Sequence, residues 1–198
     1  GVGGGVYISR LLGAKQVVKA SQVASVSVLT SVMLAALIAL VCNAFLPDIL
    51  LFMGANEEMI SLAESYGRLF IISCVIGTLN VSMSNIIVSQ GASKTSASAM
   101  IIGSIVNVAL DPLFIYTFNW GVEGAAWATI IAQAVSCIWV TAYFFGKSSL
   151  LKMKLKNFKL SSYIVWSIVS IGFAPFMLQM AGSLIQFILS KQIVYAYS

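Results

Sequence analysis

Residues 21–46 read SQVASVSVLTSVMLAALIALVCNAFL and contain no charged side chain. A helix needs about 20 apolar residues to cross a bilayer, so this stretch suffices for one crossing. β-barrel strands would be shorter and would alternate apolar with polar residues, so the pattern favours helices. The chain is therefore predicted to be an all-α membrane protein, a polytopic helical bundle. Four later charge-free stretches predict further spans: 69–93, with its helix beginning near Met59; 95–110, continuing through Asp111 to about Phe118; 124–146; and 160–190.

The composition agrees with a lipid environment. Of the 198 residues 60% are hydrophobic and 9% are charged, against roughly 25% charged residues in a soluble domain. The chain has no His, and it shows no nucleophile–base pair, phosphate-binding loop or metal-ligand cluster, so we expect no enzyme. The opening residues GVGGGVYIS look like the end of a helix that is already in progress. We expect the chain to be a fragment at both ends.

The basic residues indicate the orientation of the spans. Short cytoplasmic loops carry an excess of Lys and Arg. All basic residues except Arg68 and Lys191 fall in the first, third and fifth loops, near 10–19, at 94 and at 147–159. The acidic residues all lie in the other loops or in the membrane half nearest them. These three basic loops are therefore predicted to be cytoplasmic in a multi-pass protein of the cell membrane, and a nucleic-acid partner is not expected.

Asp111 is the most informative polar residue, because it interrupts an apolar span. An ionisable group inside a membrane helix is expensive unless it faces a cavity or a partner. Pro112 follows it and should bend the helix, since proline cannot donate the usual backbone hydrogen bond. Asn107 lies four residues earlier and therefore on the same helix face. An Asp that caps the outer helix end, and an Asn that only bonds a neighbouring helix, are the structural alternatives.

Two further side chains are candidates for the same site. Thr129 lies eight residues past Gly121, so its depth in the next antiparallel span matches that of Asp111. Small-residue packing is its alternative role. Tyr66 lies near the outer start of an earlier span, where it could instead belong to an interfacial aromatic belt. Together with Asn107 and Asp111, these residues offer oxygen atoms to a small cation or a cradle for a protonatable carboxyl group.

Several stretches resemble the multidrug and toxic compound extrusion (MATE) family. The similarity is most specific at NVALDPLF and WGVEGAAWAT, and it extends in order along nearly the whole chain. The stretches that carry it are ISRLLGAK (8–15), LLFMGA (50–55), AESYGR (63–68), QGASK (90–94), NVALDPLF (107–114) and WGVEGAAWAT (120–129).

The resemblance implies twelve helices in two six-helix lobes around a central cleft. Residues 1–146 then correspond to the amino-terminal lobe from the end of helix 2 to helix 6. Residues 147–159 correspond to a basic cytoplasmic linker between the lobes, and 160–198 to helix 7, the start of the second lobe. The chain would thus hold most of one lobe and the first helix of the next, without the acidic residue that the family places on helix 1.

The resemblance also implies a function and a site. The family's amino-terminal cation site maps onto Asp111, Asn107, Thr129 and Tyr66, with Pro112 at the helix bend and Na⁺ as a possible ligand of the first three residues. The expected function is secondary active transport, multidrug efflux by Na⁺ or H⁺ antiport. The coupling ion replaces any cofactor, the substrates are small organic cations, and no obligate protein partner is expected beyond the lipid bilayer.

Two alternatives stay open at this point. One is a lipid-linked oligosaccharide flippase of the same superfamily, although such proteins tend to place basic residues in the central cavity. The other is a truncated remnant that does not transport.

Overall fold

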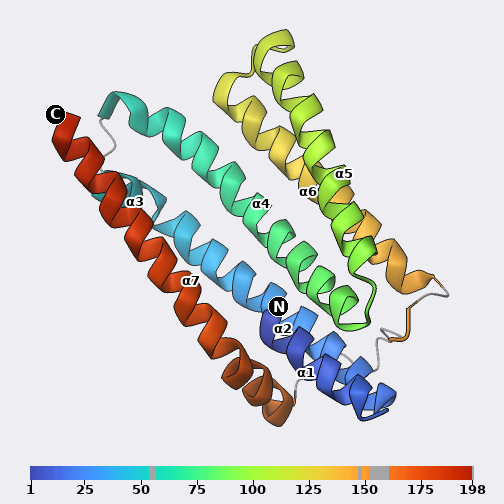
Figure 1. The fold of residues 1–198 in the computed structure, drawn as a ribbon. Helices are drawn as coiled ribbons and strands as arrows, with labels where there is room; N and C mark the ends of the chain where they lie inside the picture. Colours follow the sequence, from blue (N-terminus) through green and yellow to red (C-terminus); the bar gives the residue numbers. More distant parts are fainter. Residues whose placement is uncertain (54–56, 147–148, 152–160, 198) are drawn as a thin grey trace.

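A computed structural model describes residues 1–198 except 54–56, 147–148, 152–160 and 198. The described residues form helices joined by short connections, which confirms the predicted all-α bundle (Figure 1). The helices are α1 (Val2–Gly13), α2 (Val17–Ala44), α3 (Leu46–Met53), α4 (Glu57–Ser89), α5 (Ser93–Pro112), the π-helix η1 (Leu113–Thr117), α6 (Gly121–Phe145) and α7 (Ser162–Tyr197).

Five of these segments are long and apolar enough to cross a membrane, as the charge-free stretches predict. They are Val17–Ala44, Ala63–Ser89, Ser93–Thr117, Gly121–Phe145 and Ser162–Leu189. α1 confirms the expected helix at the start of the chain.

The short helix α3 was not anticipated from the sequence. Pro47 and Asp48 were interpreted only as the end of the preceding span. Both residues also suit the first turn of a new helix, because proline needs no donor there and a carboxylate interacts favourably with the helix dipole. α3 accordingly begins at Leu46 with Asp48 in its first turn.

The connections between spans alternate between two ends of the bundle. The α1–α2, α4–α5 and α6–α7 connections lie at one end, and those of α2 with α3 and α4, and of η1 with α6, lie at the other (Figure 1). The first end carries Arg10, Lys15, Lys19 and Lys94, and we call it the basic end. The second carries Asp48 and Glu123, and we call it the acidic end.

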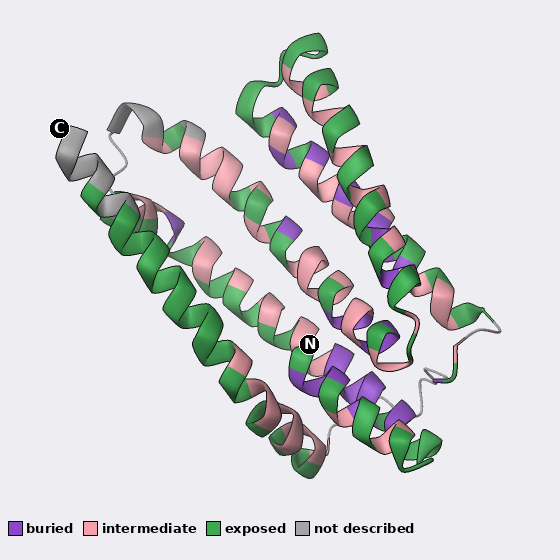
Figure 2. Ribbon diagram, in the orientation of Figure 1, coloured by how far each residue is buried: buried purple, intermediate pink, exposed green. Residues whose placement is uncertain are grey.

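The helices pack in a clear order. α6 packs closely against both α4 and α5, and α2 packs against α4. α1 contacts α2, α4 and α7, so it lies between the α2–α4 pair and α7. Figure 2 shows many of the buried residues at the basic end, where Ile8 of α1, Ile87 of α4 and Val140 of α6 share one apolar cluster, and others along α6.

Three consecutive glycines explain how α1 fits among so many neighbours. A Cβ on Gly3 would lie 2.3 Å from the Ile168 carbonyl oxygen of α7. One on Gly4 would lie 2.1 Å from Ser27 Oγ of α2, and one on Gly5 would lie 3.1 Å from the Asn85 carbonyl oxygen of α4. Successive helix residues point about 100° apart, so each glycine admits a different helix.

Candidate cation and substrate cavity

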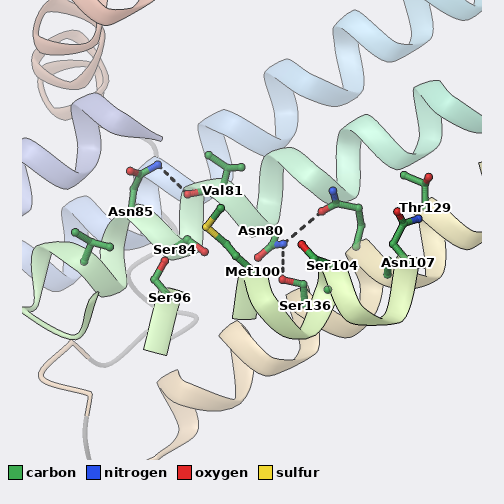
Figure 3. A pocket seen from close by; sticks show the side chains of 14 residues that line it. Asn80, Val81, Ser84, Asn85, Ser96, Met100, Ser104, Asn107, Thr129 and Ser136 are labelled. Atoms are coloured by element: carbon green, nitrogen blue, oxygen red, sulfur yellow. Dashed lines mark hydrogen bonds between the residues drawn. The ribbon is translucent and has the colours of Figure 1, made fainter. Parts of the chain in front are cut away.

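A cavity of about 490 Å³ lies between α4, α5 and α6. Its size falls within the roughly 300–1,000 Å³ of small-molecule sites. Nine of its fourteen lining residues have polar, uncharged side chains. The polar side chains that line it are Asn80, Ser84, Asn85, Ser96, Ser104, Asn107, Thr129, Gln133 and Ser136 (Figure 3).

The cavity runs along the helices. Asn107 and Thr129 line it nearer the acidic end, and Ser96 lines it nearer the basic end. Thr129 and Ser136 are seven residues apart on α6, which is about 10 Å along the helix axis. The arrangement therefore offers polar groups at several depths of the bundle.

Asn107 and Asp111 are in contact at the acidic end. The Asn107 amide Nδ2 donates a hydrogen bond of 3.4 Å to Asp111 Oδ1. Asp111 is half-buried and lies one helical turn beyond the cavity residue Asn107. The contact links the acidic side chain of α5 to a residue of the cavity wall.

Thr129 faces the same cavity from α6, as its depth in the sequence predicts. Its hydroxyl donates to the Ala125 carbonyl oxygen at 3.0 Å, within its own helix. The donor is thereby used, and the lone pairs of Oγ1 remain available to a cation or to another donor. Thr129 and Asn107 are brought together by the fold.

Tyr66 takes a different position. It is half-buried on α4, and its ring stacks on Phe70 with ring centroids 5.8 Å apart. Within the part of the chain that the structure describes, no hydrogen bond joins Tyr66 to Asp111 or Thr129. The structure thus places Asn107 and Thr129 on the wall of the cavity and joins Asp111 to it through Asn107, whereas Tyr66 is not among the lining residues.

The helix changes its hydrogen-bonding pattern directly after Pro112. α5 ends at Pro112 and the π-helix η1 follows over Leu113–Thr117. The Phe118 N–H bonds the Leu113 carbonyl oxygen at 3.0 Å, five residues back. Pro112 has no N–H for the Val108 carbonyl group, so the irregular turn lies immediately beside Asp111, where irregular backbone often marks functional sites.

Asn80, Gln133 and Ser136 connect the three helices deeper in the cavity. Asn80 Nδ2 donates to Ser136 Oγ at 2.8 Å and to Gln133 Oε1 at 3.4 Å (Figure 3). Ser136 Oγ in turn donates to the Ala99 carbonyl oxygen of α5 at 2.9 Å. This network of hydrogen bonds joins α4, α6 and α5 beside the cavity.

These deeper residues carry no charge and were not predicted from the sequence. A signal was nevertheless present. Thr129, Gln133 and Ser136 are spaced i, i+4, i+7, and Asn80 and Ser84 are spaced i, i+4, so each set lies on one helix face. Polar stripes at helical spacing within charge-free spans predict a shared polar surface.

The fold and site together define a class: a multi-pass helical membrane protein with a polar cavity between its spans. Comparison with known proteins gives the family. The family model described as MatE matches residues 1–113. The multidrug export protein MepA of Staphylococcus saprophyticus is 31% identical over 178 residues, which are 90% of this chain and 40% of that protein.

Solved structures agree with this result. An outward-facing multidrug resistance MATE family transporter of the MOP superfamily matches with a TM-score of 0.87 at 30% identity, over 96% of this chain and 42% of that chain. The inward-facing conformation of such a transporter matches with a TM-score of 0.82 at 30% identity, over 87% and 39%. The chain belongs to the multidrug and toxic compound extrusion family, and it spans about two fifths of the length of these relatives.

Proposed function

We propose that the protein of which this chain forms part is a secondary active transporter that exports small organic molecules by Na⁺ or H⁺ antiport. The observation that carries the proposal is the Asn107–Asp111 pair at the outer end of the polar cavity. Ionisable residues within membrane helices often mark ion and proton pathways, and Asp111 contacts a residue of the cavity wall. The multidrug export function named for the staphylococcal relative is consistent with this role.

The side chains fit either coupling ion. Asp111 supplies a carboxylate, Asn107 an amide oxygen and Thr129 a hydroxyl oxygen, and hard cations prefer such ligands. The Asn107 amide now presents its nitrogen to Asp111. A Na⁺ ion shared by both residues would need the amide to turn its oxygen inward, whereas protonation of Asp111 would neutralise its carboxylate.

The cavity suits an uncharged or cationic organic substrate. Its lining offers amide and hydroxyl groups together with Met100 and Val88, and none of the lining residues is basic. Basic groups would be expected for a lipid-linked pyrophosphate, so the lining favours drug efflux over the flippase alternative. We place residues 1–146 in the first lobe and 160–198 at the start of the second, with 147–159 as the linker, most of which lies outside the described residues.

The decisive experiment replaces Asp111 in the full-length transporter. Proteoliposomes containing Asp111→Asn should lose dye efflux driven by imposed Na⁺ or pH gradients, because the substituted amide neither protonates nor carries a negative charge. Asp48→Asn is the matched control, since Asp48 is an exposed carboxylate on the short helix α3, outside the membrane-spanning segments. Gradients imposed separately identify the coupling ion. Full efflux by Asp111→Asn would refute the proposed coupling role.

A further inference from the structure

Three residues near the start of the connection between α6 and α7, Ser149–Leu151, fold back onto the bundle. α6 ends at Phe145, and Ser149–Leu151 return to the α4–α5 turn at the basic end. The contact is made by Gln90, which directly follows the last residue of α4. These residues play no part in the cavity and were not singled out in the sequence.

The side-chain oxygen of Gln90 binds the backbone of this segment. This oxygen, Oε1, accepts hydrogen bonds from the Leu150 N–H at 2.9 Å and from the Leu151 N–H at 3.3 Å. Ser149 Oγ lies 3.2 Å from the same oxygen, but its single proton has a nearer acceptor in the Leu151 carbonyl oxygen at 2.8 Å. Gln90 Nε2 donates to the Ile86 carbonyl oxygen at 3.3 Å, which fixes the direction of the amide. One side chain therefore holds two consecutive backbone N–H groups, those of Leu150 and Leu151.

Leu151 adds an apolar component. Its side chain is 0% exposed and belongs to the buried cluster that contains Ile8, Ile87 and Val140. These residues lie on α1, α4 and α6, so Leu151 is enclosed by three helices of the bundle. A buried leucine side chain and two backbone hydrogen bonds therefore attach this segment to the bundle.

We propose that Gln90 and Leu151 form an anchor that makes the start of the α6–α7 connection a rigid part of the first lobe. Only the chain after Leu151 then accommodates movement of α7 relative to α4 and α6. From Phe145 to Ser162 the connection would reach at most about 55 Å, whereas from Leu151 it reaches about 35 Å at full extension. The anchor thus shortens the length of chain that links α7 to the first lobe.

The anchor can be tested by limited trypsin digestion of the full-length protein in detergent. Cleavage after Lys152 requires trypsin to bind Ser149–Leu151 as an extended strand, and the anchor holds these residues on the bundle. Cleavage after Lys156 or Lys159 does not involve them. The ratio of the two cleavage rates, followed by mass spectrometry of the fragments, therefore reports release of the anchor within one sample.

Gln90→Ala should raise cleavage after Lys152 about tenfold or more relative to cleavage after Lys159. Leu151→Ser should raise the same ratio, because it removes the buried apolar side chain of the anchor. Gln22→Ala, at an exposed position of α2, should leave the ratio unchanged. Thermal melting of each variant verifies that the bundle remains folded.

An equal Lys152-to-Lys159 ratio in wild type, Gln90→Ala and Leu151→Ser would overturn the proposal, as would rapid cleavage after Lys152 in the wild type. Because the readout involves no transport, it is independent of the coupling role assigned to Asp111. A further measurement in proteoliposomes, with and without a dye gradient, tests rigidity: the Lys152 protection should be the same in both conditions, and its loss during transport would contradict a permanent anchor.

Discussion

Replacement of Gly3 by alanine tests the close crossing of α1 and α7. The added Cβ would lie 2.3 Å from the Ile168 carbonyl oxygen and 2.7 Å from the Gly172 nitrogen. Ordinary C···O contacts are about 3.3–3.6 Å, so the two helices must separate by roughly 1 Å. The opposing atoms belong to the backbone of α7, which cannot avoid the methyl group by a change of rotamer.

The magnitude follows from two opposing effects. Overpacking of a well-packed contact costs about 1–3 kcal/mol. Alanine is favoured over glycine in a helix interior by about 0.8–1 kcal/mol. The net loss is at most about 2 kcal/mol, which lowers the melting temperature by at most roughly 8 °C, because 1 kcal/mol corresponds to about 2–4 °C for 150–250 residues and to less for a longer chain. The assay is thermal unfolding of the full-length protein in detergent, followed by tryptophan fluorescence.

Gly13→Ala is the matched control in the same helix. A Cβ at Gly13 would meet nothing within 4 Å, so only the gain in helix propensity remains and the melting temperature should rise slightly or stay constant. The reasoning is refuted if Gly3→Ala melts at or above the wild-type temperature. Equal shifts in both variants would show that propensity, and not the α1–α7 contact, determines the result.

Two further predictions concern the hydrogen-bond network of Asn80, Gln133 and Ser136 and the membrane topology. Ser136→Ala removes two hydrogen bonds that join α6 to α4 and α5. It should lower the free energy of unfolding by about 1–3 kcal/mol, as measured by the same melting assay. Ser170→Ala, at an exposed position of α7, should change the melting temperature little, and equal melting of the two variants would contradict a stabilising role of the network. In intact cells, a membrane-impermeant thiol reagent should label Asp48→Cys but not Lys15→Cys in an otherwise cysteine-free protein, and the reverse pattern would contradict a cytoplasmic basic end.

Much of the fold could be predicted from the sequence because charge is excluded from the lipid-crossing segments. The charge-free stretch 21–46 corresponds to α2, and 124–146 corresponds to α6. Boundaries were less predictable where a residue has two roles. Pro47 both ends one helix and suits the start of the next. The last membrane span ends at Leu189, just before Lys191 as predicted, although the helix α7 itself continues to Tyr197.

In the candidate site, the contacts within one helix could be predicted from the sequence, whereas the contacts between helices could not. Asp111 and Asn107 lie four residues apart on one helix, so their contact follows from helix geometry. The contact of Asn80 with Ser136 joins residues on different helices and depends on the relative rotation of α4 and α6. A single sequence contains the polar stripes but not the pairing between them. The Gln90 contact was equally hidden, because its partners include backbone N–H groups, which every residue but proline carries.

The glycines of α1 relate the cavity to α7. The cavity is built by α4, α5 and α6, whereas among the described residues the backbone of α7 packs only against α1 and α2. Gly5 of α1 contacts the backbone of Asn85, a residue of the cavity wall, and Gly3 contacts Gly172 of α7. Both contacts are tight, and they are two residues apart on one rigid helix. Because the opposing atoms at both glycines belong to backbone, neither contact can relax by a change of rotamer, and the two glycines together fix how closely α1 approaches α4 and α7.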